Sequence, residues 1–160
     1  MISAVIRERG FTPRLALRKL KEINKVVGEE VGSYWHDHFR AKHFTQAGAR
    51  EYGYEKRNVR YMIKKARKWG HRDPLVWSGL SRMLSKIKDI KTTSTSARAR
   101  VRVVLHTPTL NFIPSGGHIN MRDEMTRVSR PEIEKLAEVA ADSIDRQLSA
   151  LTETSTRRIA

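Results

Sequence analysis

The chain has 160 residues with 32 Lys and Arg against 17 Asp and Glu, so its formal net charge at neutral pH is +15. Its hydrophobic fraction of 39% is too high for a wholly disordered chain, and no apolar run reaches the roughly 20 residues that span a bilayer. It has no cysteine, which excludes disulfide scaffolds, zinc ribbons and thiol chemistry. The first residues lack the apolar segment of a secretory signal. We therefore expect an intracellular protein with anionic partners and no membrane contact.

The positive charge is concentrated in one part of the chain. Residues 40–72 hold eleven Lys or Arg and two acids, a net charge of +9, whereas residues 131–160 carry a net charge of −2. Unlike ends of this kind favour head-to-tail contact between copies or with neighbouring proteins. They equally suit a nucleic-acid-binding protein with an acidic helix facing solvent.

A long helix is predicted near the start, after an arm at residues 1–12. Thr12 and Pro13 form an N-cap followed by proline at the first helical position. Apolar and aromatic residues then recur every three or four positions, which predicts a helix over 13–43 with a kink near Gly28 and Gly32. Residues 44–53 form a loop or a bent helical turn in this prediction.

A second, basic helix is predicted over residues 55–69. Its apolar residues share one face and are expected to point inward: Val59, Met62, Ile63, Ala66 and Trp69. Gly70 is suited to end this helix, and Pro74 follows shortly after it.

The rest of the chain predicts an antiparallel hairpin and a C-terminal helix. Residues 86–92 and 98–105 alternate as strands do, with a polar turn between them. An extended loop follows at 106–118, then a short strand around 119–127. Ser129 and Glu132 form a capping box that opens an amphipathic helix, and residues 152–160 form a flexible tail. The fold class is therefore α+β, with the two helices packed on a small antiparallel sheet in one domain over 13–151.

Chemical motifs are sparse. Three histidines and an aspartate lie between His36 and His43, but on a helix His36 and His38 point in different directions, and His36 and His43 are roughly 10 Å apart along the axis. We interpret this segment as a packed or interfacial surface rather than a metal site. Neither a phosphate-binding glycine loop nor a nucleophile elbow occurs, so we expect no enzymatic activity and no cofactor.

The basic helix is the main candidate for a binding surface. Its cations lie on one stripe and its flanks, where they can contact nucleic-acid phosphates or an acidic partner: Arg57, Arg60, Lys64, Arg67 and Lys68. The alternative is a solvated helix face whose charges pair with an acidic neighbour, and the sequence does not separate the two. The candidate contacts between subunits are aromatic, histidine and loop residues: Trp35, His38, Trp77, Leu110 and Phe112.

An ordered series of short motifs runs through most of the chain. His38-Phe-x4-Phe-Thr-x2-Gly-Ala49 is followed by Tyr52-Gly-Tyr54, then by Arg57, Tyr61, Lys64-Lys-x-Arg67 and Gly70. Pro74-Leu-Val-x-Ser-Gly-Leu80 comes next, then the hairpin, the loop and Glu124-Met-Thr-x-Val-Ser129 before the last helix. In this order, over residues 34–150, the chain resembles the neck and tail-completion proteins of tailed bacteriophages, which include tail terminators and head–tail joining proteins.

The resemblance implies a non-catalytic structural protein of the virion, assembled in the host cytoplasm. It implies a homo-oligomeric ring, commonly sixfold, at the neck, the head–tail junction or the tail end. Neighbouring neck, connector or tail-tube proteins are its implied partners, with non-specific contact to genomic DNA. The hairpin is then expected to extend a sheet between subunits, and the 106–118 loop to dock on the adjoining ring. The alternative function is a basic nucleic-acid-binding protein, either ribosome-associated or a DNA-packaging factor.

Overall fold

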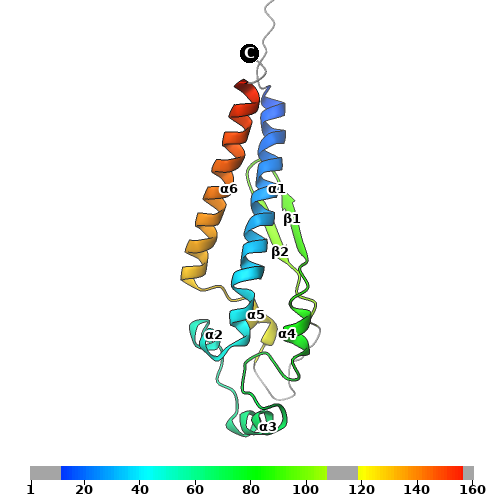
Figure 1. Cartoon of the computed structure of the whole chain (residues 1–160), viewed down its shortest axis with the longest axis vertical. Coiled ribbons are helices and arrows are strands. Elements are labelled where there is room, and N and C mark those ends of the chain that lie inside the picture. The colour runs from blue at the N-terminus through cyan, green and yellow to red at the C-terminus, as the bar shows by residue number, and fades with distance from the viewer. Residues whose placement is uncertain (1–11, 108–118, 157–160) are drawn as a thin grey trace, which may run out of the picture.

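The computed structural model describes residues 12–107 and 119–156, and it confirms the α+β class. Two long helices, α1 (Pro13–His38) and α6 (Arg130–Thr156), run in opposite directions and are joined at one end by shorter elements. The hairpin of β1 (Ile90–Ser94) and β2 (Ala99–Val103) packs on α1. Helix α1 therefore lies between α6 and the hairpin, as Figure 1 shows.

The first helix starts where the sequence predicts and ends earlier. The Thr12 side chain accepts a hydrogen bond from the Leu15 amide at 3.3 Å, and Pro13 occupies the first turn. After His38 the chain tightens into a 3₁₀ turn, η1 (Arg40–Phe44), and then forms the short helix α2 (Gln46–Glu51). The predicted helix to residue 43 is therefore too long by the length of this 3₁₀ turn.

The two glycines of α1 allow the hairpin to approach the helix closely. A Cβ built on Gly28 would lie 2.8 Å from Thr92 Cγ2, and one on Gly32 would lie 2.8 Å from Val101 Cγ1. Helix α1 runs through both positions as one continuous helix. The glycines are thus explained by packing against the sheet rather than by the predicted kink.

The hairpin is confirmed, but it is shorter than predicted and is the only sheet in the described residues. Ile90 pairs with Val103 and Ser94 with Ala99, and the turn falls at 95–98. The predicted strand over 119–127 is wrong, because Met121–Met125 forms helix α5. Asn120 starts this helix by accepting hydrogen bonds from the amides of Arg122 and Asp123.

The core lies at the end of the molecule where the short elements meet. It contains Phe44, Leu75, Val76 and Met125, each at most 6% exposed, with Trp35 and Leu105 packed around them. Leu75 has a φ of 55° between Pro74 and Val76, which turns its side chain into this core. Helix α4 (Leu80–Leu84) follows this turn and leads into the hairpin.

The last helix follows its predicted start and extends past its predicted end. Glu132 accepts a hydrogen bond from the Ser129 amide at 3.2 Å, which is one half of the capping box. The Ser129 hydroxyl instead donates to Glu51 at 2.9 Å and ties α6 to α2. Helix α6 continues to Thr156, so the predicted tail from residue 152 is partly helical. The arm at 1–11 and residues 108–118 lie outside the described residues.

Candidate interaction surfaces

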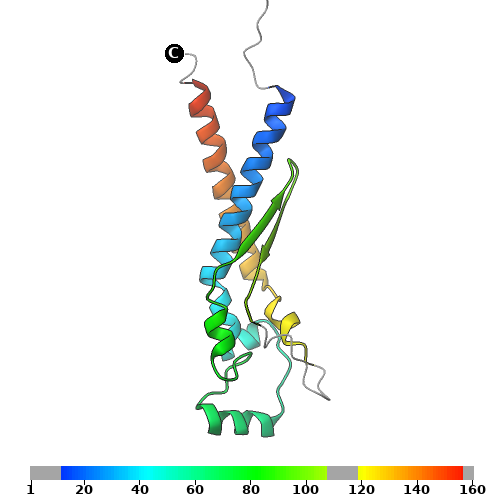
Figure 2. The same cartoon turned by 90° about the vertical axis from the view of Figure 1, so that its right-hand side faces the viewer.

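Helix α3 (Val59–Trp69) forms one end of the molecule, on the side away from the hairpin, as Figure 2 shows. It begins at Asn58, whose side chain accepts from the Arg60 amide at 2.8 Å, and ends at Gly70 with a φ of 71°. It carries five Lys or Arg and no acid. The prediction that this helix packs on the sheet is therefore wrong, although its helical character is confirmed.

The predicted inward face of α3 is also wrong. Val59 is 72% exposed and Ile63 42% exposed, whereas Lys65 is buried. The Lys65 ammonium donates a hydrogen bond to the Asp73 carbonyl, and burial lowers its pKa to about 8. Helix α3 contacts the 70–77 segment through Asp73 and Trp77, and Val59 and Ile63 stay uncovered.

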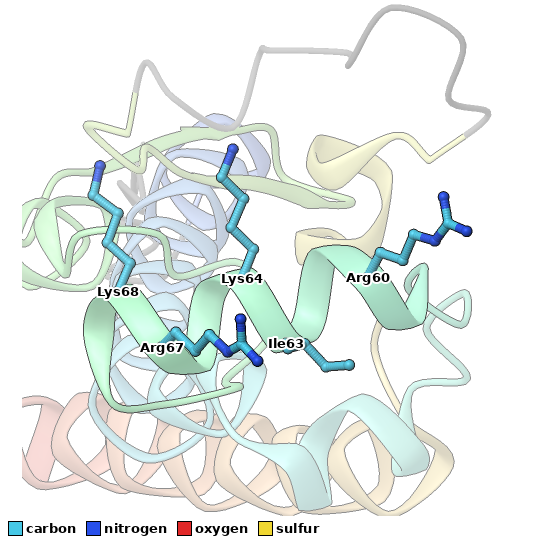
Figure 3. A pocket seen from close by; sticks show the side chains of 5 residues that line it. All are labelled: Arg60, Ile63, Lys64, Arg67 and Lys68. Carbon is cyan, nitrogen blue, oxygen red and sulfur yellow. The ribbon is translucent and has the colours of Figure 1, made fainter.

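Four cations of α3 and Ile63 line a shallow surface depression, shown in Figure 3: Arg60, Ile63, Lys64, Arg67 and Lys68. Lys64 and Lys68 project side by side from the helix, and Arg67 lies beside Ile63. The structure therefore brings together four of the five predicted basic contact residues. This basic surface, defined by the five lining residues, is open to a partner.

Arg57, the fifth predicted contact residue, is not part of the basic surface. Its guanidinium is 15% exposed and forms a two-pronged ion pair with Glu124, whose side chain is 2% exposed. Glu124 also accepts from the Glu55 amide at 3.0 Å. Arg57 thus joins the segment before α3 to α5 and has a structural role, because moving it to a partner would leave a carboxylate buried without its cation.

Trp77, predicted as an inter-subunit contact, belongs to an aromatic cluster under α3. Its ring stacks on Tyr61 with 5.6 Å between centroids and meets Trp69 edge-on at 6.3 Å. The Lys68 ammonium lies 5.2 Å from the Trp69 ring centre, within cation–π range. Trp77 is 38% exposed, so it holds α3 and still contributes to the surface.

The histidines near the end of α1 have three different environments. The His36 Nε2 lies 3.1 Å from the Ser85 carbonyl, and the His43 Nδ1 lies 2.5 Å from the Tyr54 hydroxyl. His38 is exposed and lies against Tyr34. In the described part of the chain, no three His, Asp or Glu side chains come together as a metal site would require. Trp35 is half-buried against the core, so of this predicted pair only His38 lies on the surface.

A second surface, the acidic groove, runs between α1 and α6. Its lining contains four carboxylates against one arginine and one histidine: Val26, Glu29, Glu30, Ser33, Tyr34, Asp37, His38, Val139, Asp142 and Arg146. Hydrogen bonds from Lys88 and His36 lower the pKa of Asp37 to about 2, so this carboxyl group stays ionised at neutral pH. Sequence analysis missed the groove because its acids come from two helices far apart in the chain.

A buried polar cluster at the core end was also missed. The ring of His43 is fully buried and stacks on Tyr52 at 4.0 Å, and the Tyr52 hydroxyl donates to the buried carboxylate of Glu132. Burial lowers the pKa of His43 to about 4. These contacts join η1 and the 52–57 segment to the start of α6. Leu110 and Phe112, the remaining predicted contacts, lie outside the described residues.

No protein-family model matches this chain, and neither a curated protein nor a solved structure matches it. No helix in the described ranges is long and apolar enough to cross a membrane.

Proposed function

We propose that the chain is a structural subunit of a tailed-phage virion that assembles with copies of itself as a ring at the neck or the tail end. The ordered motifs from His38 to Ser129 are the basis for naming this class of protein. The same proposal includes a ring that is commonly sixfold and that contacts neck, connector or tail-tube proteins. It also places the chain in the virion after assembly in the host cytoplasm. The observation from the structure that supports it is a set of apolar residues that the chain leaves uncovered.

Both long helices carry large apolar side chains that face solvent. On α1 these are Leu15, Leu17 and Leu20, between 42% and 54% exposed, and on α6 they include Ile133 at 57% and Leu148 at 45%. Burying a side chain of this size contributes about 1.5–3 kcal/mol. A helix that folds only against its own chain normally turns most of its large apolar side chains inward. Exposed apolar side chains on two helices therefore suit a subunit that completes its core with a neighbour.

The hairpin supports the same proposal. Because the sheet has two strands, each strand has one edge whose backbone groups are unpaired within the described residues. Such edges accept a further strand from another chain.

The test is made on particles. In the phage that encodes the chain, quantitative mass spectrometry of purified virions is expected to find several copies per genome. Replacing Leu17 and Leu148 together by Glu is expected to remove the chain from particles and leave defective necks or tails. Lys21→Glu, at an exposed polar position one turn from Leu17, is the matched control for the added negative charge and is expected to assemble normally. Complete particles that lack the chain would refute the proposal.

A nucleic-acid-binding protein is the second candidate, favoured by one observation. Helix α3 carries five cations and no carboxylate at an exposed end of the molecule. Titration with duplex DNA and single-stranded RNA at several salt concentrations tests it. If α3 binds nucleic-acid phosphates, Arg60→Ala and Lys64→Ala each reduce the slope of log binding constant against log salt concentration by about one. Lys21→Ala does not change this slope. Unchanged slopes would exclude this role for α3.

A further inference from the structure

The basic surface and the acidic groove are complementary in charge. Helix α3 holds no acid of its own, and the cations that line its depression are exposed. The groove lining carries four carboxylates against Arg146 and His38. Three of these acids have partners within the chain, Glu29 with Lys25, Glu30 with Arg146 and Asp37 with Lys88, and all three pairs are partly exposed to solvent. The four carboxylates outnumber these three cations, so the groove keeps an acidic excess that a cationic helix can neutralise.

The two surfaces also match in size. Helix α3 has 11 residues and is about 16 Å long at 1.5 Å per residue. The groove follows α1 from Val26 to His38, which is about 18 Å on the same scale. Arg60 and Arg67 are seven positions apart on α3, as are Glu30 and Asp37 on α1. Two cations of α3 can thus reach two acids of the groove at once.

Each surface has apolar residues in addition to charge. Val59 and Ile63 lie exposed among the cations of α3, and the groove includes Val26, Tyr34 and Val139. An amphipathic helix that binds in a groove uses such residues for affinity and the charges for orientation. A phosphate backbone offers no apolar surface to cover Val59 or Ile63. The apolar residues therefore favour a protein groove over nucleic acid as the partner of α3.

We propose that α3 of one copy docks in the acidic groove between α1 and α6 of a second copy. This inference rests on the proposed ring, for which it supplies the contact between subunits. Within one chain α3 lies beyond the end of α1, as Figure 1 shows, so it leaves the groove of its own chain uncovered. Each copy then gives α3 to one neighbour and offers its groove to another. A head-to-tail contact of this kind closes into a ring when the rotation between copies is a simple fraction of a turn.

Cross-linking detects the contact directly. A mixture of ¹⁵N-labelled and unlabelled full-length chain is treated with a carbodiimide, which joins lysine amines to carboxylates in contact. The expected products are mixed-isotope links from Lys64 or Lys68 to Glu29 or Asp142. Absence of these links at a chain concentration of about 1 mM would overturn the proposal, because a contact too weak to populate there cannot build a ring.

Charge reversal provides the matched variants. One variant carries Arg60→Glu with Lys64→Glu, and the other carries Glu29→Lys with Asp142→Lys; all four positions are exposed. Each variant alone is expected to lose the links about tenfold or more, because each change removes reactive groups of the linked pairs and places like charges opposite one another. A mixture of the two variants is expected to regain carbodiimide-detected association, since each altered surface meets its opposite. Failure of the mixture to recover would overturn the proposal.

The outcomes separate this contact from the proposed function and from nucleic acid. If the chain is found in particles but the links are absent, the ring proposal stands and this contact is wrong. If the links form but the chain is absent from virions, self-association stands and the virion role is wrong. If only the α3 reversal has an effect, and that effect is lost binding of duplex DNA, nucleic acid is the partner and the docking is refuted.

Discussion

The end of the molecule built from η1, α2, α4 and α5, here the core end, buries Phe44, Leu75, Val76 and Met125. The rest of the described molecule, formed by α1, α6 and the hairpin and called here the helical half, buries only Ile23 and Val27 among its large apolar residues. The core end therefore has its own core, supported by buried polar contacts. The helical half relies on two helices lying side by side and leaves apolar residues uncovered. This difference indicates that the core end depends less on a neighbour and that the helical half is the part that gains most from one.

The largest effect is expected from breaking the ion pair at the core end. Arg57→Ala leaves the Glu124 carboxylate buried without its cation, and we expect a loss of about 3–5 kcal/mol in the free energy of unfolding. Urea denaturation measures it. Arg60→Ala, an exposed arginine three positions away, is expected to change stability by about 0.5 kcal/mol or less. Equal effects of the two changes would mean that the ion pair does not stabilise this end.

A pH dependence is expected from His43, also at the core end. Its pKa is 6.5 when unfolded and about 4 in the fold, so below pH 6.5 the unfolded chain binds a proton that the folded chain does not. Stability is therefore full above pH 6.5 and falls with pH until about 4. Between pH 7.5 and 5 the expected loss is about 2 kcal/mol.

Urea denaturation across this pH range measures the effect, with two variants for comparison. His43→Gln is expected to remove this part of the pH dependence, and His38→Gln, at an exposed position, is expected to retain it. A pH dependence that persists unchanged in His43→Gln would assign it to other groups.

The smallest effect is expected in the helical half, from Gly32→Ala. Alanine favours a helix over glycine by about 1 kcal/mol, but its Cβ would lie 2.8 Å from Val101 Cγ1 and 2.9 Å from Ile90 Cγ2. Both neighbours are β-branched and stiff, so we expect a net loss of about 1 kcal/mol. In a double-mutant cycle, Val101→Ala is expected to relieve the clash. A stabilised Gly32→Ala would show that the helix and the hairpin are not in close contact.

Local signals in the sequence predicted most of the elements. Thr12-Pro13, Gly70, and Ser129 with Glu132 mark helix ends through contacts within a few residues, and the structure bears these ends out. Alternation predicted the hairpin for the same reason. The predicted start of the second helix at residue 55 is wrong, because the Asn58 side chain caps the helix and α3 begins at Val59. The strand predicted at 119–127 is wrong because Asn120 caps a helical turn, and a cap decides the structure of such a short segment.

Contacts between distant segments could not be predicted. The apolar side chains of α3 imply an inward face, yet Val59 and Ile63 are exposed. Arg57 looks like the other cations in the sequence, and only its pairing with Glu124, 67 residues away, gives it a structural role. The acidic groove and the His43 cluster likewise arise from segments brought together by the fold. Four of the five basic candidates lie together because they share one helix.

Pro13 and Thr156 lie at the same end of the molecule, and α3 lies at the other (Figure 1). The long axis therefore has a direction that can be marked. A gold or fluorescent label attached beside either residue identifies the end opposite to α3 and leaves α3 free. In electron micrographs of an assembly, labels on the outer rim would mean that α3 points towards the axis, and labels near the axis would mean that it points outward. One label would then give the orientation of every subunit.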